Sequence, residues 1–343
     1  MLSRLGLPLF LLLLAALASL LLALGIGSAQ IAPGQIWAIV LNDLGLNNLA
    51  FNNLGPGEIA QGEGDALARI MVVELRLPRA LSAFAVGGLL AVAGALMQVL
   101  LRNPLADPYV LGLSGGASIG ALAAMLGGFG GLAISGSAFS GALFSTFLVF
   151  GLAHGSGGWT PSRLLLTGVV VAAGWGAVIT LMLALSPAER LPGMLYWLMG
   201  DLSYSRTPWP PLLLLLAICV VLVPLGRSLN VLARGPQQAA ALGVAVKPLE
   251  WCIYIAASLL TAAAVTTAGS IGFVGLVVPH MLRLLLGNDQ RLILPACALA
   301  GGTLLVLADT LARTMVAPEQ LPVGVITALL GVPTFLFLLY RSR

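Results

Sequence analysis

The feature that most constrains this chain is residues 76–120, RLPRALSAFAVGGLLAVAGALMQVLLRNPLADPYVLGLSGGASIG. Residues 80–101 carry no charge, and such a run of about 22 residues can cross the roughly 30 Å hydrocarbon core of a bilayer as a helix. Residues 102–104 (Arg-Asn-Pro) interrupt the run, and a second helix rich in small residues is expected to begin near Tyr109. The rest of the chain repeats this pattern of apolar span and short polar turn.

Composition determines the class of protein. Hydrophobic residues make up 59% of the chain and charged residues 8%, and the mean hydropathy is +1.04. A soluble domain carries roughly 25% charged residues, so the sequence predicts a polytopic membrane protein. The net charge of +4 is poor evidence for nucleic-acid binding, because membrane proteins collect arginine at their cytoplasmic face. Cys219, Cys252 and Cys297 are far apart in or at the ends of apolar spans and form no metal or disulfide pattern.

Ten apolar spans are expected along the chain. They cover residues 5–27, 76–101, 110–126, 132–153, 164–185, 212–225, 251–268, 271–286 (with a break at Pro279), 292–312 and 323–340. Between them we expect a periplasmic loop at residues 30–75 and a cytoplasmic loop at residues 227–247. The first span exceeds the apolar region of a secretory signal, about 7–15 residues, so we expect an uncleaved helix. Cleavage at the small residues 27–29 is the alternative.

The distribution of Lys and Arg predicts the orientation. Ten spans place both termini on one side of the membrane. That side would hold Arg4, Arg102, Arg163, Arg227, Arg234, Lys247, Arg283, Arg291, Arg341 and Arg343, and the other side Arg69, Arg76, Arg79, Arg190, Arg206 and Arg313. Positively charged residues gather on the cytoplasmic side, so both termini are expected there. Arg76, Arg79 and Arg313 lie at helix ends on the disfavoured side and need a reason.

The sequence has no nucleotide-binding motif of its own. GxxxxGK[ST] does not occur, and the single lysine, Lys247, stands outside any glycine-rich loop. Residues 113–116 (LSGG) resemble the start of an ABC ATPase signature, but they open an apolar helix. There Gly112, Gly116 and Gly120 recur at a spacing of four, which favours a face for close helix packing.

Few ionisable groups lie within the spans. Asp309 and Arg313 are one helical turn apart and are expected to pair, although an intramembrane acid is also a candidate proton relay. Gln98 is expected to bond a neighbouring helix, with a place along a transport path as the alternative. His154 and His280 lie far apart without acidic neighbours, so no metal site is expected. No catalytic residue is expected either, because no nucleophile stands with a base.

Five ordered blocks of the sequence resemble the permease subunits of type II ABC importers, the FecCD-type permeases for ferric siderophores, haem and cobalamin. The blocks are RLPRALSAFAVGGLLAVAGALMQ (76–98), RNPLADPYVLGLSGGA (102–117), SRLLLTGV (162–169), GSIGFVGLVVPHMLRLLLG (269–287) and LPVGVITALLGVPTFLFLL (321–339). The resemblance implies an all-α subunit of about ten transmembrane helices, forming one permease domain over residues 1–343 and a homodimer. It also implies two cytoplasmic ABC ATPases, which use ATP and Mg, and a periplasmic binding protein. No cofactor is expected on this chain.

The resemblance assigns roles to individual residues at the periplasmic face. Arg76, Arg79 and Arg313 match arginines that receive carboxylates from the two lobes of the binding protein, through charge-assisted and often bidentate pairs. The alternative is that Glu74, Asp309 or lipid phosphates satisfy these arginines.

On the cytoplasmic side, residues 234–243 (RGPQQAAALG) are expected to form one short helix, since Pro236 suits a first helical position and Gly243 a C-terminal cap. In the family this is the coupling helix that contacts the ATPase. A plain connecting helix is the alternative. Its expected members are Pro236, Gln237, Gln238, Ala239, Ala240, Leu242 and Gly243. Pro161 and Ser162 match a cytoplasmic gate of cobalamin permeases, in which Pro161 replaces a hydroxyl residue.

We therefore expect a transport subunit in the bacterial inner membrane rather than an enzyme. It would import an iron chelate (siderophore or haem) or cobalamin by alternating access, with the iron chelates favoured by a small margin. The fifth span and residues 191–199 are the expected pore-lining segments. A proton-coupled secondary transporter is the alternative, and Asp309 is its candidate acid.

Overall fold

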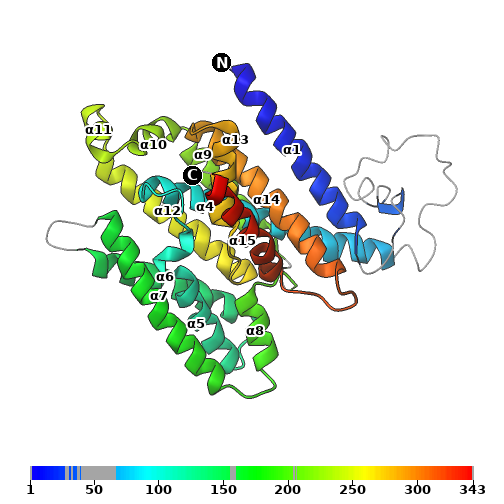
Figure 1. The fold of residues 1–343 in the computed structure, drawn as a ribbon. Helices are drawn as coiled ribbons and strands as arrows, with labels where there is room; N and C mark the ends of the chain where they lie inside the picture. Colours follow the sequence, from blue (N-terminus) through cyan, green and yellow to red (C-terminus); the bar gives the residue numbers. More distant parts are fainter. Residues whose placement is uncertain are drawn as a thin grey trace.

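The computed structural model describes residues 2–27, 31, 34–36, 39, 67–154, 160–203, 205 and 207–341. Helices make up the described part of the chain, without a β-strand (Figure 1). The longer helices are α1 (Leu2–Gly25), α4 (Leu77–Leu100), α6 (Gly131–Ala153), α7 (Pro161–Ala184), α12 (Val246–Ala268), α14 (Gln290–Thr314) and α15 (Val323–Arg341). The shorter ones are η2 (Ile70–Arg76), η3 (Pro108–Leu111), α5 (Leu113–Leu126), α8 (Leu191–Met199), α9 (Trp209–Leu222), α10 (Gly226–Leu232), α11 (Pro236–Ala241) and α13 (Val274–Leu286).

Among these described helices, six are long and apolar enough to cross a membrane: α1, α4 with the turns before it, α6, α7, α12 and α14. The number becomes seven if α9 and α10 count as one span, although the two are bent by 72° at the break between them. Helices α5, α13 and α15 are apolar but shorter. The all-α membrane fold is therefore confirmed, whereas the expected ten spans are not. Most of the expected periplasmic loop, residues 30–75, lies outside the described residues.

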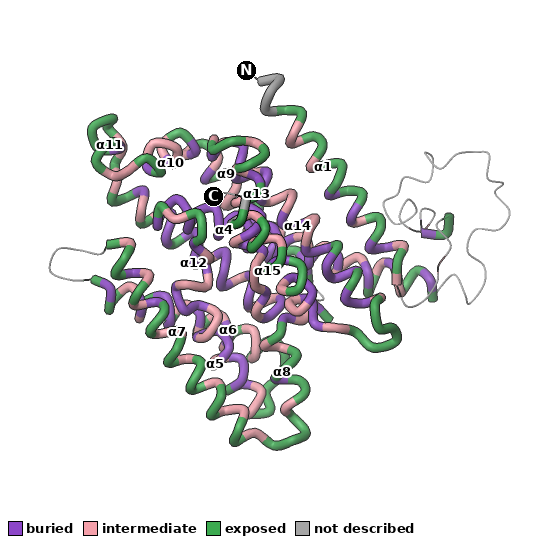
Figure 2. Tube along the Cα trace, in the orientation of Figure 1, coloured by how far each residue is buried: buried purple, intermediate pink, exposed green. Residues whose placement is uncertain are grey.

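Helix α4 forms the centre of the fold. Of its 24 residues, those from Ala85 to Leu100 are all buried, and the tube in Figure 2 shows α4 enclosed by other helices. Helices α14, α12 and α13 pack against it. The lack of charge in this stretch thus reflects contact with protein rather than with lipid, because a buried charge needs a partner.

Pro279 does not break the eighth expected span. It lies inside α13, and the interruption comes earlier, in the segment between α12 and α13, where Gly269 and Phe273 have φ values of 68° and 69°. Proline has no N–H to donate to the carbonyl four residues back, which here belongs to Gly275. That oxygen instead faces Gly94 of α4, where a Cβ would overlap it. The expected break was wrong because close packing on α4 supports the helix around the proline.

The three glycines spaced by four residues, Gly112, Gly116 and Gly120, have two different functions. Gly116 and Gly120 lie against α6, where added Cβ atoms would overlap the carbonyl oxygens of Gly141 and Ser137. Gly112 precedes α5 with a φ of 69°, a left-handed conformation that favours glycine. Its carbonyl accepts a hydrogen bond from Ser145 Oγ at 2.8 Å. Gly116 and Gly120 therefore allow α5 and α6 to approach closely, while Gly112 provides the turn into α5.

Candidate functional site

Asp309 on α14 is the centre of a buried cluster of charged residues. Its carboxylate, 1% exposed, accepts hydrogen bonds from Nε and NH2 of Arg79 on α4, at 3.0 and 2.8 Å. Arg313, one turn further along α14, places its Nε 3.2 Å from Oδ2, the oxygen that also accepts from Arg79 Nε. The pair expected from the spacing of Asp309 and Arg313 is present. Two guanidinium groups share one carboxylate, so these three residues carry a net positive charge.

Arg76 and Arg313 also contact the C-terminal end of α1. Arg76 donates from NH1 to the carbonyl of Leu24 at 2.7 Å, and Arg313 donates from NH2 to the carbonyl of Ala23 at 3.3 Å. The last carbonyls of a helix lack partners within it and carry the negative end of its dipole. The two arginines therefore cap α1 and join it to η2 and α14. This contact is one reason for the presence of Arg76 and Arg313, which are expected on the side of the membrane that holds fewer positive charges.

Arg79 has, in addition, an edge that faces outward. Its NH1 donates to Gln320 Oε1 at 2.7 Å and to Ser203 Oγ at 3.2 Å. Ser203 follows α8 and Gln320 precedes α15, and both hydrogen bonds are exposed. Arg76 and Arg313 are only 7% and 8% exposed. The Arg79 side chain is 11% exposed, so Arg79 differs from the other two arginines in the exposed acceptors of its NH1 rather than in a large exposed area.

The residues that complete this cluster were not found from the sequence. Asp309 was expected as a partner of Arg79 only as an alternative to docking, whereas its shortest contact is with Arg79, 230 positions away in the chain. Ser203, Gln320 and the end of α1 were missed. The available signal was that one acid and three arginines stand at the ends of otherwise uncharged spans, since such charges are expected to find one another.

The predicted coupling helix occurs as α11, at the edge of the molecule beside α10 (Figure 1). Pro236 is its first residue, and Gly243, with a φ of 78°, follows its end. Ala239 is buried, whereas Gln237, Gln238, Ala240 and Leu242 are exposed. The expected cytoplasmic loop thus contains two short helices, and α11 presents most of its side chains outward.

A polar contact fixes α10 to the start of α14. Asn230 donates from Nδ2 to Asp289 Oδ1 at 2.8 Å and accepts a hydrogen bond from the backbone N–H of Gln290 at 2.7 Å. Asp289 also accepts hydrogen bonds from the side chain of Arg291, the shortest at 2.7 Å. The Arg291 guanidinium, and after it the Asn230 amide, lower the pKa of Asp289 to about 2. The segment that carries α11 is therefore held by an ionised carboxylate.

The two expected gate residues lie at the start of α7. Pro161 is the first residue of the helix, where its missing N–H costs nothing. Thr160 caps the helix by accepting a hydrogen bond from the N–H of Arg163 at 3.3 Å, and Ser162 is exposed. Residues 155–159, which precede this point, lie outside the described residues. The gate role of Pro161 and Ser162 stays a prediction, since one chain alone does not contain the path between two.

A metal site is not found in the described residues, because nowhere in them do three His, Cys, Asp or Glu side chains come together. The expectation that this chain binds no cofactor stays untested.

Comparison with known proteins gives one consistent result. The model of the FecCD transport family matches residues 12–341. An uncharacterized ABC transporter permease protein of Bacillus subtilis is 42% identical over 294 residues, which is 82% of each chain. The cobalamin import system permease protein of Halobacterium salinarum is 44% identical over 80% of this chain and 74% of its own length. The hemin transport system permease protein of Yersinia pestis is 41% identical over 81% of this chain and 85% of its own.

The fold has a counterpart among solved structures. An ABC transporter assigned to the metal-chelate type, solved in an inward-facing conformation, matches with a TM-score of 0.80 and 30% identity. The match covers 97% of this chain and 98% of the other. The likeness thus includes the first helix, α1, which the five sequence blocks did not reach.

Proposed function

Because this chain belongs to the FecCD transport family, we propose that two copies of it enclose the path by which an ABC importer moves a bulky metal chelate into the cytoplasm. The chain is the permease subunit of an ABC importer, a multi-pass membrane component and not an enzyme. The observation that carries the proposal is the match to the metal-chelate type transporter over 97% of the chain.

The proposed cargo is an organic ligand that encloses a metal ion. Relatives named for cobalamin and for hemin are 44% and 41% identical to this chain, so their names support the class of cargo without separating its members. The small preference for an iron chelate over cobalamin has no support in these identities. Siderophore, haem and cobalamin are therefore tested as candidate cargoes without a preference among them.

Energy for import is proposed to come from two separate ATPase subunits at the cytoplasmic face. This chain has no P-loop, and α11 is an exposed helix that a partner can bind. Closure of the ATPases on ATP would move α11 and, through the Asn230–Asp289 contact, the start of α14. The cleft between two copies would then open alternately to each side.

Delivery of the cargo is proposed to use the cluster around Asp309. Arg79 directs its NH1 toward exposed polar acceptors, and a carboxylate on a periplasmic binding protein is a stronger acceptor than an amide or hydroxyl oxygen. Arg76 and Arg313 would add positive potential behind it. Direct docking on those two residues would require the end of α1 to move away.

The alternative expected from the sequence, a proton-coupled secondary transporter, is opposed by the family match and by the pairing of its candidate acid. Its candidate acid, Asp309, forms ion pairs with two guanidinium groups. Such a transporter needs an unpaired acid within the membrane, and Asp309 is paired.

The decisive experiment is reconstitution of the chain into liposomes with and without its ATPase and binding protein. Uptake of haem, an iron–siderophore and cobalamin would be followed with ATP inside and with a protonophore. We expect uptake of one chelate that requires ATP and both partners. Uphill uptake by the chain alone, abolished by the protonophore, would overturn the proposal in favour of the secondary transporter.

A further inference from the structure

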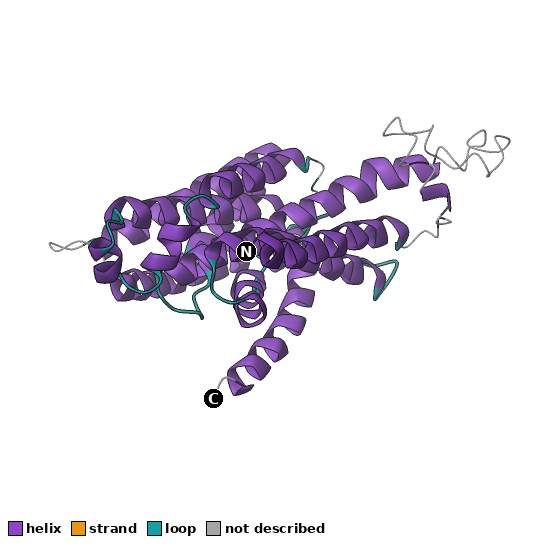
Figure 3. Cartoon of the chain, turned by 90° about the horizontal axis from the view of Figure 1, so that it is seen from above, coloured by secondary structure: helices purple, strands orange, loops and turns teal. Residues whose placement is uncertain are grey.

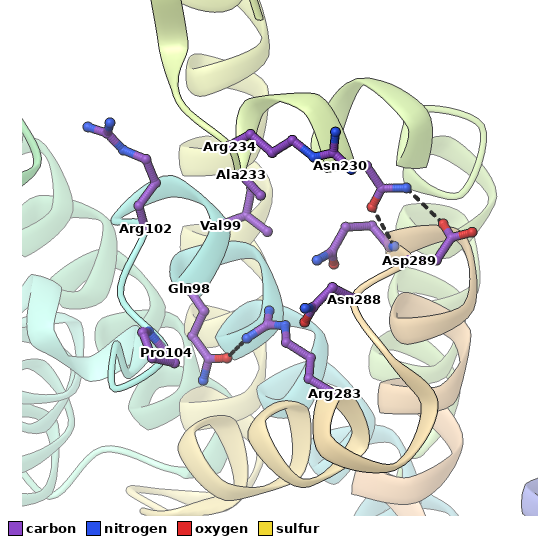
Figure 4. Close-up of a pocket in the computed structure, with 11 residues that line it drawn as sticks. Gln98, Val99, Arg102, Pro104, Asn230, Ala233, Arg234, Arg283, Asn288 and Asp289 are labelled. Atoms are coloured by element: carbon purple, nitrogen blue, oxygen red, sulfur yellow. Dashed lines mark hydrogen bonds between the residues drawn. The ribbon is translucent and has the colours of Figure 1, made fainter. Parts of the chain in front are cut away.

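A polar cavity of about 550 Å³ lies beside α10, away from the cluster around Asp309. It is formed where the end of α4 and the turn after it meet α10, α13 and the turn before α14 (Figure 4). Its lining residues are Gln98, Val99, Arg102, Pro104, Asn230, Ala233, Arg234, Arg283, Asn288, Asp289 and Gln290. The lining contains three arginines and only one acid, Asp289.

Arg283 brings a positive charge to this cavity without a carboxylate partner in the described residues. Its guanidinium donates to Gln98 Oε1 and, at 3.3 Å, to the carbonyl of Ala95. The acid of the lining, Asp289, is engaged by Arg291 and Asn230. Gln98 does bond a neighbouring helix, as expected, and through Arg283 it also positions a cation. A cation held by neutral groups in a partly buried site favours an anionic ligand.

Gln290, which also lines this cavity, has a side-chain oxygen without a hydrogen-bond partner. Its side chain is 2% exposed, and its buried Oε1 has no hydrogen-bond partner. Its backbone N–H, in contrast, donates to Asn230 Oδ1 at 2.7 Å. A buried amide left unpaired costs roughly 1–3 kcal/mol, and native structures keep few of them. Because Oε1 only accepts, a ligand pairs it through an O–H, such as that of hydrogen phosphate or of a glycerol headgroup.

We propose that this cavity binds a phosphate group, either free or as the ester of an anionic phospholipid headgroup. Arg283 and Arg234 line the cavity with guanidinium groups, on opposite sides of it in Figure 4, and Asn288 and Gln290 line it with amides, from three separate segments. Donors from several directions suit the tetrahedral oxygens of phosphate, and arginine is well matched to them. Basic pockets between transmembrane helices are known to take such headgroups. In Figure 4 the guanidinium of Arg102 points away from these groups, so it is not assigned to the ligand.

Binding here would connect moving parts. Arg234 immediately precedes the turn into α11, whereas Arg283 belongs to α13 and Gln290 to α14. A bound phosphate would tie the segment carrying α11 to both helices. The site itself rests on the geometry of one chain and does not depend on which cargo is carried.

The test uses the purified full-length chain in detergent after removal of lipid. One arm measures the thermal unfolding midpoint with inorganic phosphate against chloride at equal ionic strength. The other arm measures retention of phosphatidylglycerol against phosphatidylcholine by native mass spectrometry. Binding in the first arm identifies a soluble phosphate, and retention of phosphatidylglycerol alone identifies a lipid headgroup. Binding in neither arm overturns the proposal.

Variants locate the binding. Arg234→Gln and Asn288→Leu change exposed side chains, so both are expected to fold, and each should weaken binding by about tenfold or more. Arg283→Gln should abolish it. Arg227→Gln is the matched control. It removes the same charge from an exposed position on α10 that does not line the cavity. Equal weakening by Arg227→Gln, or unchanged binding in Arg234→Gln and Asn288→Leu, would show that no built site exists.

Discussion

Arg79 on α4 and Asp309 on α14 form a bidentate ion pair, in which Nε and NH2 of the guanidinium lie 3.0 and 2.8 Å from the carboxylate oxygens. The pair connects the central helix of the fold to the helix that packs most extensively against it. Because Arg313 uses the same carboxylate, one acid pairs with two arginines. The stability of this end of the molecule and the docking of a partner therefore depend on the same residue.

Replacing Asp309 with asparagine should destabilise the protein strongly. Removing one partner of a buried ion pair leaves the other charge uncompensated, which costs roughly 3–5 kcal/mol. We expect a clear fall in the thermal unfolding midpoint of the purified chain. Glu319→Gln, which removes an exposed acid before α15, is the control and should change the midpoint little. Equal midpoints for Asp309→Asn and the wild type would contradict the central role of this carboxylate.

Gln320 offers a test of docking that spares the fold. Reversing Arg76 and Arg79 to Glu would also break contacts to α1 and Asp309, so lost uptake would have two explanations. Gln320→Glu instead places a carboxylate on NH1 of Arg79, where it competes with a partner's acid. We expect binding-protein affinity to fall about tenfold, with no loss of thermal stability. Gln320→Ala, without a competing charge, should bind at least as well as the wild type. Equal affinity in both variants would rule out docking through Arg79.

Ala240→Pro should separate ATP hydrolysis from transport. A proline in the interior of α11 removes a helical hydrogen bond and clashes with the preceding turn, at a cost of about 3 kcal/mol to the helix. In liposomes with the partner ATPase we expect hydrolysis to continue while chelate uptake is lost. Ala240→Ser changes the same exposed position but keeps the helix, so it should retain both activities. Normal uptake by Ala240→Pro would mean that α11 is only a connection.

Gly94→Ala should disrupt the contact between α4 and α13. The new Cβ would overlap the Gly275 carbonyl, which is backbone and cannot rotate away. Overpacking of this kind costs about 1–3 kcal/mol, and we expect a lower unfolding midpoint and a lower yield of folded protein. Gly151→Ala is the control on α6, where an added Cβ meets nothing within 4 Å. It should be neutral or slightly stabilising. A neutral Gly94→Ala would contradict the described packing.

The contact of α10 with α14 should weaken in acid. The pKa of Asp289 is lowered from 3.8 to about 2 in the folded protein, chiefly by hydrogen bonds from Arg291. The unfolded state therefore binds the proton more tightly, so this contribution is present above about pH 4 and disappears as the pH falls toward 2. Asp289→Asn should remove this part of the pH dependence. The unfolding midpoint of both proteins between pH 5 and 2 checks it, and parallel curves would refute it.

Several local features were predictable from residue order. The membrane class follows from apolar runs, because a bilayer requires each spanning segment to satisfy its own backbone hydrogen bonds. The Asp309–Arg313 pair follows from the spacing of one helical turn. Helix α11 follows from Pro236 at its start and Gly243 after its end. The all-α permease fold follows from five sequence blocks, whose family the comparisons bear out.

Where a prediction required knowing which helices are neighbours, the sequence was insufficient. It placed a break at Pro279, but packing of Gly94 against Gly275 supports a continuous α13. It proposed docking on Arg76, Arg79 and Arg313 without showing that Arg76 and Arg313 bond the end of α1, whereas NH1 of Arg79 bonds exposed acceptors. The cavity beside α10 was not predicted at all.

By itself, then, the sequence determined the class of protein, the position of most helices and the contacts made within one helical turn. These features depend on composition and on the spacing of residues within one helical turn. A short window of the sequence contains all of that information. The tertiary structure alone decided that Asp309 serves Arg79, that α1 covers Arg76, and that Arg283 and Gln290 face one cavity. Such contacts join residues that are far apart in the chain. They depend on which helices pack together and on how the helix surfaces fit.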